Sequence, residues 1–202
     1  MDVRLSIIIA TIGRPTLLTA LRSLEPQITD ADEVLVIPDF PRHGGWGYVA
    51  HNKGARLASG THLIWIGDDD DFLPGALDVV REALREAPDS VHLFSVYQKP
   101  GVPTPRGTPA EARDFASILC IQGGLVVPRS VNPMPEWRPD NGADKLFAAQ
   151  AVANSKRDPV WHPPTCIGRW RTHTWPGWRP ITEQERPTAF DQMHTFLRPV
   201  PE

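Results

Sequence analysis

Residues 68–71 are four consecutive aspartates, and their type and spacing indicate chemistry more clearly than any other stretch of this chain. Neighbouring carboxylates about 4 Å apart repel by roughly 4 kcal/mol per pair at an effective dielectric near 20, and a divalent cation relieves that repulsion. Oxygen ligands suit Mg²⁺ or Mn²⁺, and such a cation neutralises a bound diphosphate. The run therefore predicts a metal or phosphate site. The alternative is that some of these carboxylates only cap a helix starting near Pro74.

A buried strand must position this acidic turn. Residues 63–66 form a short apolar run between two glycines, which is typical of a strand in a sheet covered on both faces. Open α/β sheets bind ligands at the carboxyl ends of such strands. Residues 5–10 and 34–37 predict two more strands, and the loops that follow them carry Thr11 and Asp39. If the strands are parallel, these two loops are neighbours.

Helical patterns separate the predicted strands. Pro15 suits the first position of a helix, and leucines recur on one face of that helix as far as residue 24. Residues 49–58 and 74–86 predict two further helices, and residues 91–96 predict a fourth strand. Because strand and helix alternate, the first half of the chain favours a doubly wound α/β sheet with right-handed crossovers.

The second half of the chain is less regular. Residues 99–109 are rich in proline and glycine and predict a loop, and residues 117–127 hold two apolar runs broken by a pair of glycines. Residues 128–139 form a proline-rich connection. Apolar positions after Asp144 then predict a helix that reaches about residue 152.

Length and composition favour one domain without a nucleic-acid signature. The chain has 202 residues and a formal net charge of -3, so the overall charge gives no footprint for nucleic acid, although a local basic groove stays open. Cys120 and Cys166 lie in apolar runs, and we expect reduced core residues there. The apolar run near the N-terminus is too short for a signal peptide, and no stretch of about 18 apolar residues occurs. We therefore expect a soluble, cytoplasmic protein without a membrane anchor.

The sequence resembles the GT-A fold glycosyltransferases of family 2 in two stretches, LSIIIATIGRPTLLTALRSL and HNKGARLASGTHLIWIGDDDD. Enzymes of this family move a sugar from a nucleoside-diphosphate donor with inversion at the anomeric carbon. The resemblance covers most of the chain and implies an α/β, GT-A (Rossmann-like) doubly wound mixed sheet in a single domain. It also implies a nucleotide-sugar-binding half at residues 1–98, an acceptor and catalytic half at 99–180, and a tail at 181–202.

The resemblance implies a donor site and a metal site next to each other. The donor would be held by Thr11, Arg14, Asp39, Asn52, Asp68 and Arg171. The metal ligands would be Asp69, Asp70 and His173. A guanidinium fork suits a diphosphate, and a neutral imidazole can complete a metal shell. The alternative for Arg171 and His173, which share one side of an extended strand, is an exposed polar strand face.

The stretch NGADKLF resembles the acidic motif that supplies the catalytic base in this family. Ala143 stands where a glutamate usually precedes the aspartate, so Asp144 is the single carboxylate and Asp140 is the fallback. One carboxylate is enough to take the proton of an acceptor hydroxyl as its oxygen attacks the anomeric carbon. The alternative role for Asp144 is to cap the helix that follows it.

These observations predict a metal-dependent inverting glycosyltransferase that uses Mn²⁺ or Mg²⁺. It would move a sugar from a nucleoside-diphosphate sugar to a hydroxyl on a small molecule, a glycan, a protein or a modified nucleic-acid base. Two alternatives stay open. One is a degenerate domain of the same fold that binds a nucleotide sugar or a partner, and the other is a sugar nucleotidyltransferase.

Overall fold

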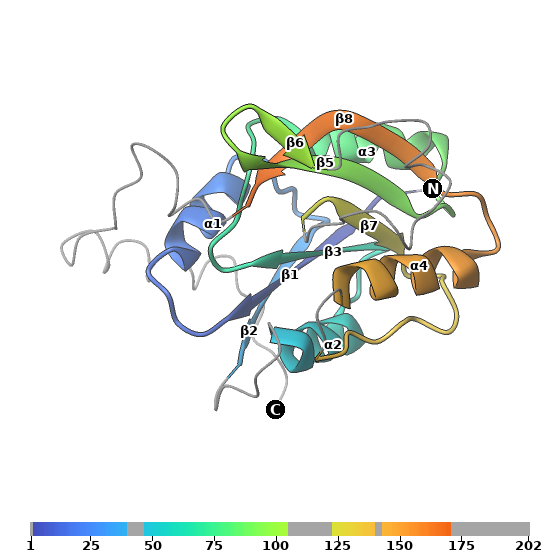
Figure 1. The fold of residues 1–202 in the computed structure, drawn as a ribbon, viewed down its shortest axis with the longest axis horizontal. Helices are drawn as coiled ribbons and strands as arrows, with labels where there is room; N and C mark the ends of the chain where they lie inside the picture. Colours follow the sequence, from blue (N-terminus) through green and yellow to red (C-terminus); the bar gives the residue numbers. More distant parts are fainter. Residues whose placement is uncertain (1, 40–46, 105–122, 140–142, 171–202) are drawn as a thin grey trace.

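The computed structural model describes residues 2–39, 47–104, 123–139 and 143–170. Within these ranges eight strands form one mixed sheet in the order β2-β1-β3-β7-β5-β8-β4, with β6 paired to β5 (Figure 1). The strands are β1 (Leu5–Thr11), β2 (Glu33–Pro38), β3 (His62–Gly67), β4 (Asp71–Phe72), β5 (His92–Lys99), β6 (Val102–Thr104), β7 (Leu125–Pro128) and β8 (Val160–Arg169). The described helices are α1 (Leu17–Leu24), α2 (Tyr48–Leu57), α3 (Ala76–Glu86) and α4 (Ala143–Ser155).

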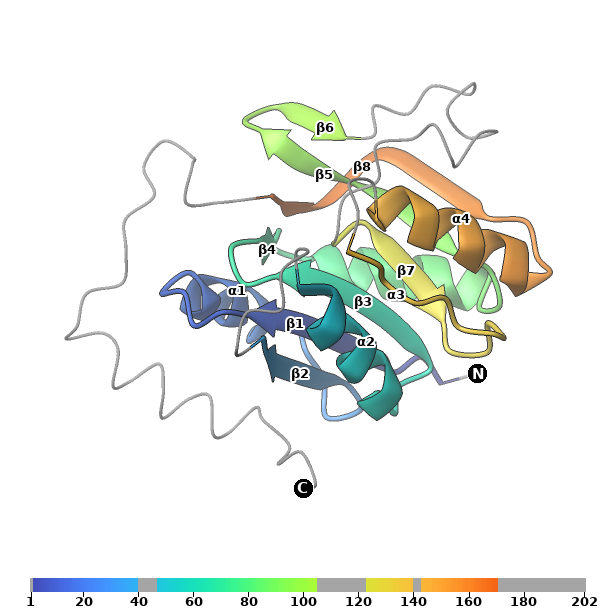
Figure 2. The same cartoon turned by 60° about the horizontal axis from the view of Figure 1, so that its bottom comes forward.

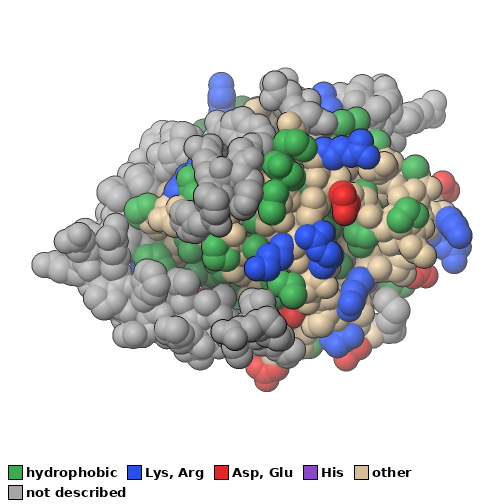
Figure 3. Space-filling model, turned by 90° about the horizontal axis from the view of Figure 1, so that it is seen from below, with side chains coloured by type: hydrophobic (Ala, Val, Ile, Leu, Met, Phe, Trp, Pro, Cys, Tyr) green, Lys and Arg blue, Asp and Glu red, His purple; other side chains and the backbone are tan. Residues whose placement is uncertain are grey.

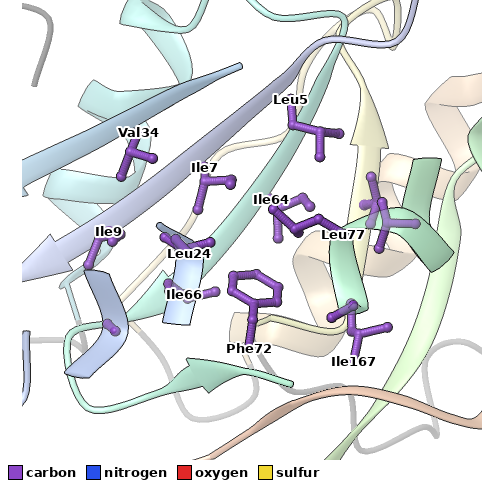
Figure 4. Packing of buried hydrophobic residues seen from close by; sticks show 14 of the residues in the cluster. Leu5, Ile7, Ile9, Leu24, Val34, Ile64, Ile66, Phe72, Leu77 and Ile167 are labelled. Carbon is purple, nitrogen blue, oxygen red and sulfur yellow. The ribbon is translucent and has the colours of Figure 1, made fainter. Parts of the chain in front are cut away.

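The helices lie in two layers because the strands bury both of their faces. On one face, α1 and α3 pack against alternate residues of β1 and β3, including Ile7, Ile9, Ile64 and Ile66 (Figure 4). On the other face, α2 and α4 pack against the residues between them, such as Ile8 and Trp65 in the same two strands (Figure 2). A strand with apolar side chains on both faces reads as a continuous apolar run. The predicted α/β fold with a doubly wound mixed sheet is therefore confirmed.

The sheet joins parallel and antiparallel strands. Strands β1 and β2, β1 and β3, and β5 and β8 pair in parallel, whereas β7 runs antiparallel to both β3 and β5. Strands β4, β6 and β8 lie where we predicted no strand: β4 closes the acidic turn against β8, and β6 lies inside the predicted loop 99–109. Helix α3 begins at Ala76 rather than at Pro74.

Close packing of α2 on the sheet requires a glycine. A Cβ atom on Gly54 would lie 2.3 Å from Cγ2 of Ile8, which is well inside van der Waals contact. The missing side chain therefore lets the helix approach β1 closely. This contact sets the distance between α2 and the edge of the sheet where Thr11 lies.

Three histidines meet at the amino edge of the sheet, opposite the acidic turn. His92 and His162 join through a 2.9 Å contact between Nδ1 and Nε2, and their rings stack. His92 Nε2 donates to the carbonyl of Ala87 at 2.8 Å, so a neutral His92 accepts through Nδ1 from His162. Burial lowers the pKa of His62, of His92 and of His162, the last to about 4. These residues are structural, as their lack of ligand spacing in the sequence indicates.

We expect the unfolding free energy to fall as the pH drops from about 6.5 to about 4. The unfolded chain protonates His162 near its ordinary pKa of 6.5, whereas the folded chain does so near pH 4, so acid favours unfolding in this window. Because the ring is only half buried, the expected loss is on the order of 1–2 kcal/mol. Urea titrations at several pH values of the parent protein and of His162→Gln measure it. Equal pH dependence in both proteins would contradict the assignment, since carboxylates titrate alike in both.

Candidate active site

The centre of the candidate site is the contact between Thr11 and Asp68. In the parallel pair β1 and β3, Ala10 lies opposite Gly67, so the next residue of each strand leaves the sheet at the same point. The Thr11 hydroxyl donates to Oδ2 of Asp68 at 2.8 Å, and the backbone N–H of Ile12 donates to the same oxygen at 3.1 Å. Both side chains are buried. The structure thus brings together two residues that the sequence placed in different loops.

Arg14 binds two carboxylates of the acidic turn at once. Its Nη1 atom lies 2.8 Å from Oδ1 of Asp68 and 3.2 Å from Oδ2 of Asp69. The Arg14 side chain is 41% exposed, so it covers the turn from the solvent side. The two carboxylates therefore converge on one positive atom. The guanidinium therefore offsets part of the repulsion between these two neighbouring carboxylates.

The other two carboxylates of the turn hold its shape. Oδ2 of Asp70 accepts the backbone N–H of Gly67 at 3.0 Å. Asp71 forms a bidentate salt bridge with Arg169. The Nε atom of Arg169 donates to one carboxylate oxygen at 2.8 Å, and Nη2 donates to the other at 2.5 Å. Burial raises the pKa of the Asp71 carboxyl, and the Arg169 guanidinium opposes that rise. Asp70 is therefore bonded to the backbone of the turn, and Asp71 is bonded to Arg169 at the end of β8.

The helix that follows the acidic turn has a glycine at its N-cap position. Helix α3 has Gly75 there, without a side-chain hydrogen bond from it, and the backbone N–H of Leu77 donates to the side-chain oxygen of Gln27 at 3.2 Å. None of residues 68–71 therefore is the N-cap residue of this helix. Two of their carboxylates contact the Arg14 guanidinium.

Asp39 lies beside this centre. It follows β2, which pairs in parallel with β1, and its backbone N–H donates to the carbonyl of Thr11 at 2.9 Å. The expectation that the loops after the first two strands are neighbours is confirmed. Asp39 is buried. Its predicted contact with a donor base stays a prediction.

The structure gives Asn52 a positioning contact. Its side-chain Nδ2 donates to the carbonyl of Trp137 at 2.9 Å, and its Oδ1 accepts the Trp137 N–H at 2.8 Å. The amide thereby holds the segment between β7 and α4 against α2. The Trp137 ring stacks on Phe147 at 4.3 Å and meets Trp65 edge-on at 5.9 Å. This cluster fixes the start of α4 next to the sheet, and donor binding by Asn52 stays a prediction.

Asp144 lies in the first turn of α4 and is half-buried. Its charge there also meets the positive end of the helix. Arg171, His173 and the fallback Asp140 lie outside the described residues. Cys166 is a half-buried free thiol, and Cys120 also lies outside the described ranges.

Sequence reasoning missed Arg169 as a residue of the acidic turn. It lies 98 positions from Asp71, and only the pairing of β4 with β8 brings the two together. The sequence did indicate that a buried acidic run needs a basic partner, but it did not indicate which arginine supplies it. Among the described residues no group of three or more histidine, cysteine or acidic side chains is arranged around a metal position. Asp68 and Asp69 converge instead on the Arg14 guanidinium.

The fold of this chain is also found in solved structures of other proteins. No protein-family model and no curated protein matches the chain. Among solved structures, S. aureus TarS residues 1-349 superimposes with a TM-score of 0.66 at 16% sequence identity, over 84% of this chain and 60% of TarS 1-349. TarS is a glycosyltransferase. The likeness establishes the fold.

Two further TarS structures carry ligands. The complex of TarS 1-349 with UDP-GlcNAc gives a TM-score of 0.65 at 16% identity, over 83% of this chain and 58% of that one. The complex with UDP gives 0.65 at 14% identity, over 95% and 64%. The chain thus spans about 60% of the length of these TarS structures. Within the part of the chain that the structure describes, no helix is long and apolar enough to cross a bilayer.

Proposed function

We propose that this protein is a metal-dependent inverting glycosyltransferase that uses a nucleoside-diphosphate sugar. The observation that carries the proposal is the convergence of Thr11, Arg14, Asp68 and Asp69 at the carboxyl edge of β1 and β3. Ligands bind at this edge in open α/β sheets. The fold is shared with TarS, whose solved complexes hold UDP-GlcNAc and UDP.

In this proposal the donor lies across the loops after β1 and β2. Thr11, Asp39 and Asp68 hold the nucleoside, with Asn52 fixing α2 beside it. Asp69 is the principal metal ligand, and Asp70 and His173 complete the set. A bound Mn²⁺ or Mg²⁺ would neutralise the diphosphate and stabilise it as a leaving group. Arg14 and Arg171 supply further positive charge to the same phosphates.

Asp144 acts as the general base. Its carboxylate takes the proton of the acceptor hydroxyl while that oxygen forms a bond to the anomeric carbon. The bond between this carbon and the diphosphate oxygen breaks, and its electron pair leaves with the nucleoside diphosphate. Attack from the side opposite the diphosphate inverts the configuration.

The test is thermal unfolding with a panel of nucleoside diphosphates and nucleotide sugars, each with and without Mn²⁺ or Mg²⁺. A ligand that binds only the folded state raises the melting temperature by mass action. We expect one nucleoside diphosphate to raise it, and the metal to increase the rise. If no nucleotide shifts the melting temperature, the donor site is refuted and a degenerate interaction domain becomes the better reading.

Substituting Arg14 should strengthen metal binding in the absence of nucleotide. Arg14 contacts Asp69, the proposed principal metal ligand, so the two cations compete, and Arg14→Gln should bind Mn²⁺ about tenfold more tightly. The same variant should bind the nucleoside diphosphate more weakly because one phosphate contact is lost. Titration of Mn²⁺ by electron paramagnetic resonance measures the first effect.

Arg22→Gln is the matched control, since Arg22 is exposed on α1 and the substitution changes the net charge equally. Unchanged or weaker Mn²⁺ binding by Arg14→Gln would show that Arg14 and the metal do not compete for Asp69.

A further inference from the structure

One face of the molecule is basic although the whole chain is acidic. We define the basic face as α2, residues 129–139 and residues 143–158. It carries seven basic side chains: Lys53, Arg56, Arg129, Arg138, Lys145, Lys156 and Arg157. Its described acidic side chains are Glu136, Asp144 and Asp158. Figure 3 shows this side of the molecule: lysine and arginine side chains gather on its described part, with an acidic side chain among them and others along the rim.

The net charge hides this asymmetry. The chain as a whole carries a formal charge of -3, so acidic residues outside this face outnumber the basic ones there. Six of the seven basic side chains are exposed, and Lys145 is half-buried. Among the described residues, the one ion pair recorded for the seven joins Arg56 to Glu136 at 4.0 Å, with both side chains largely exposed. Such a pair leaves most of the positive charge available to a ligand.

The basic face leads directly to the proposed catalytic base. Asp144 and Lys145 are consecutive in the first turn of α4. The segment with Arg138 is held on α2 by the two hydrogen bonds between Asn52 and Trp137. The basic face therefore includes the first turn of α4 with Asp144, and α4 and α2 lie on the same side of the sheet (Figures 1 and 2).

The dimensions and residue types of this face suit a phosphate polymer. Helix α4 spans about 20 Å at 1.5 Å per residue, with Lys145 in its first turn and Lys156 and Arg157 directly after its last residue. One strand of a DNA duplex presents a phosphate about every 3.4 Å, or roughly six over that length. Four of the seven basic residues are arginines, whose planar fork binds phosphate through two parallel hydrogen bonds. A nucleic-acid strand therefore offers enough regularly spaced phosphates for several of these side chains to bind it at the same time.

We propose that the basic face binds a nucleic acid and that the acceptor hydroxyl at Asp144 belongs to that nucleic acid. This inference rests on the proposed glycosyltransferase function, whose acceptor it names. Phosphate contacts would fix the position of the strand along α2 and α4. The hydroxyl, on a sugar or on a modified base, would then reach Asp144 at the end of the face.

The experiment measures binding of a fluorescein-labelled DNA duplex of about 20 base pairs by fluorescence anisotropy, at NaCl concentrations from roughly 50 to 200 mM. We expect the Kd to rise steeply with salt. The double variant Lys53→Glu, Arg138→Glu should raise the Kd at least about tenfold and reduce the slope of log K against log salt by about 2. The matched control is Arg22→Glu, Arg85→Glu on α1 and α3, which changes the net charge equally on the opposite side of the sheet.

Equal loss in the two double variants would overturn the inference, because binding would then follow net charge and not this face. A wild-type protein that ignores the duplex at low salt but binds polyphosphate through the face would overturn it in favour of another phosphate polymer. Thermal unfolding with the same panel of nucleoside diphosphates is measured on all three proteins. A nucleotide response without duplex binding refutes only the acceptor, whereas no response to any nucleotide in the wild type refutes the proposed function itself.

Discussion

Replacing Asp144 by Asn should lower turnover by about 10²–10⁴-fold, because a positioned general base contributes this much to a proton transfer. The amide has nearly the shape of the carboxylate but cannot accept the proton of the acceptor hydroxyl. Nucleotide binding should be unchanged, since the donor contacts lie on β1, β2 and the acidic turn. Initial rates of nucleoside diphosphate release and the thermal response to nucleotide measure the two effects separately.

The control for this variant is Asp30→Asn. Asp30 is exposed in the connection before β2, so its substitution makes the same chemical change outside the proposed donor site and the basic face. Asp144→Asn also removes a favourable charge from the first turn of α4, at a cost of about 0.3–1 kcal/mol in stability. If turnover in Asp144→Asn is within threefold of the parent rate at a temperature where both proteins are folded, Asp144 is not the general base. Its role is then limited to stabilising the first turn of α4.

Replacing Asp69 by Ala should abolish the increase in melting temperature that Mn²⁺ adds to a nucleoside diphosphate. A ligand at 100 times its Kd stabilises the folded state by about 2.7 kcal/mol, and the metal-dependent part of this gain should disappear. Asp69 is preferred to Asp68 for this test because Asp68 also holds Thr11 and Ile12. The Asp69 side chain is 14% exposed and that of Asp68 is 4% exposed, so truncation at 69 disturbs the turn less.

Asp30→Ala serves as the control, since Asp30 is exposed in the connection before β2. We expect it to keep the full response to metal and nucleotide. A metal response that survives in Asp69→Ala would exclude Asp69 as the principal ligand. The unfolding midpoint without ligands should be nearly equal in the two variants, and a large difference would identify a structural role for Asp69.

The first half of the fold could be predicted because its signals are local. Each strand from β1 to β3 is an apolar run, and each helix shows a repeated apolar face. Strand β4 has only two residues and begins with the charged Asp71, so no periodicity could indicate it. Strand β8 contains Pro163 and Pro164, which interrupt an apolar pattern. These strands form because their partners are already in place.

The candidate site divides in the same way. The meeting of Thr11 and Asp68 followed from the parallel pairing of two predictable strands. The contact between Asp71 and Arg169 depends on pairing between residues 98 positions apart, and the contact between Asn52 and Trp137 spans 85 positions. The periodic patterns that predict helices and strands do not indicate contacts between residues so far apart in the sequence. The resemblance to a family suggested a ligand role for Asn52, whereas the structure shows how the same amide supports the segment before α4.

The pairing of β4 with β8 has a consequence for the order in which the protein is completed. The acidic turn is made early in synthesis, but its last carboxylate meets its arginine only when β8 has left the ribosome. Before that moment, Asp71 is a carboxylate whose burial is unfavourable without a counter-charge. Contacts between segments so far apart in the chain form slowly because a long loop must close first. The nascent chain would therefore carry an open acidic turn that becomes a finished binding site only after β8 has been synthesised.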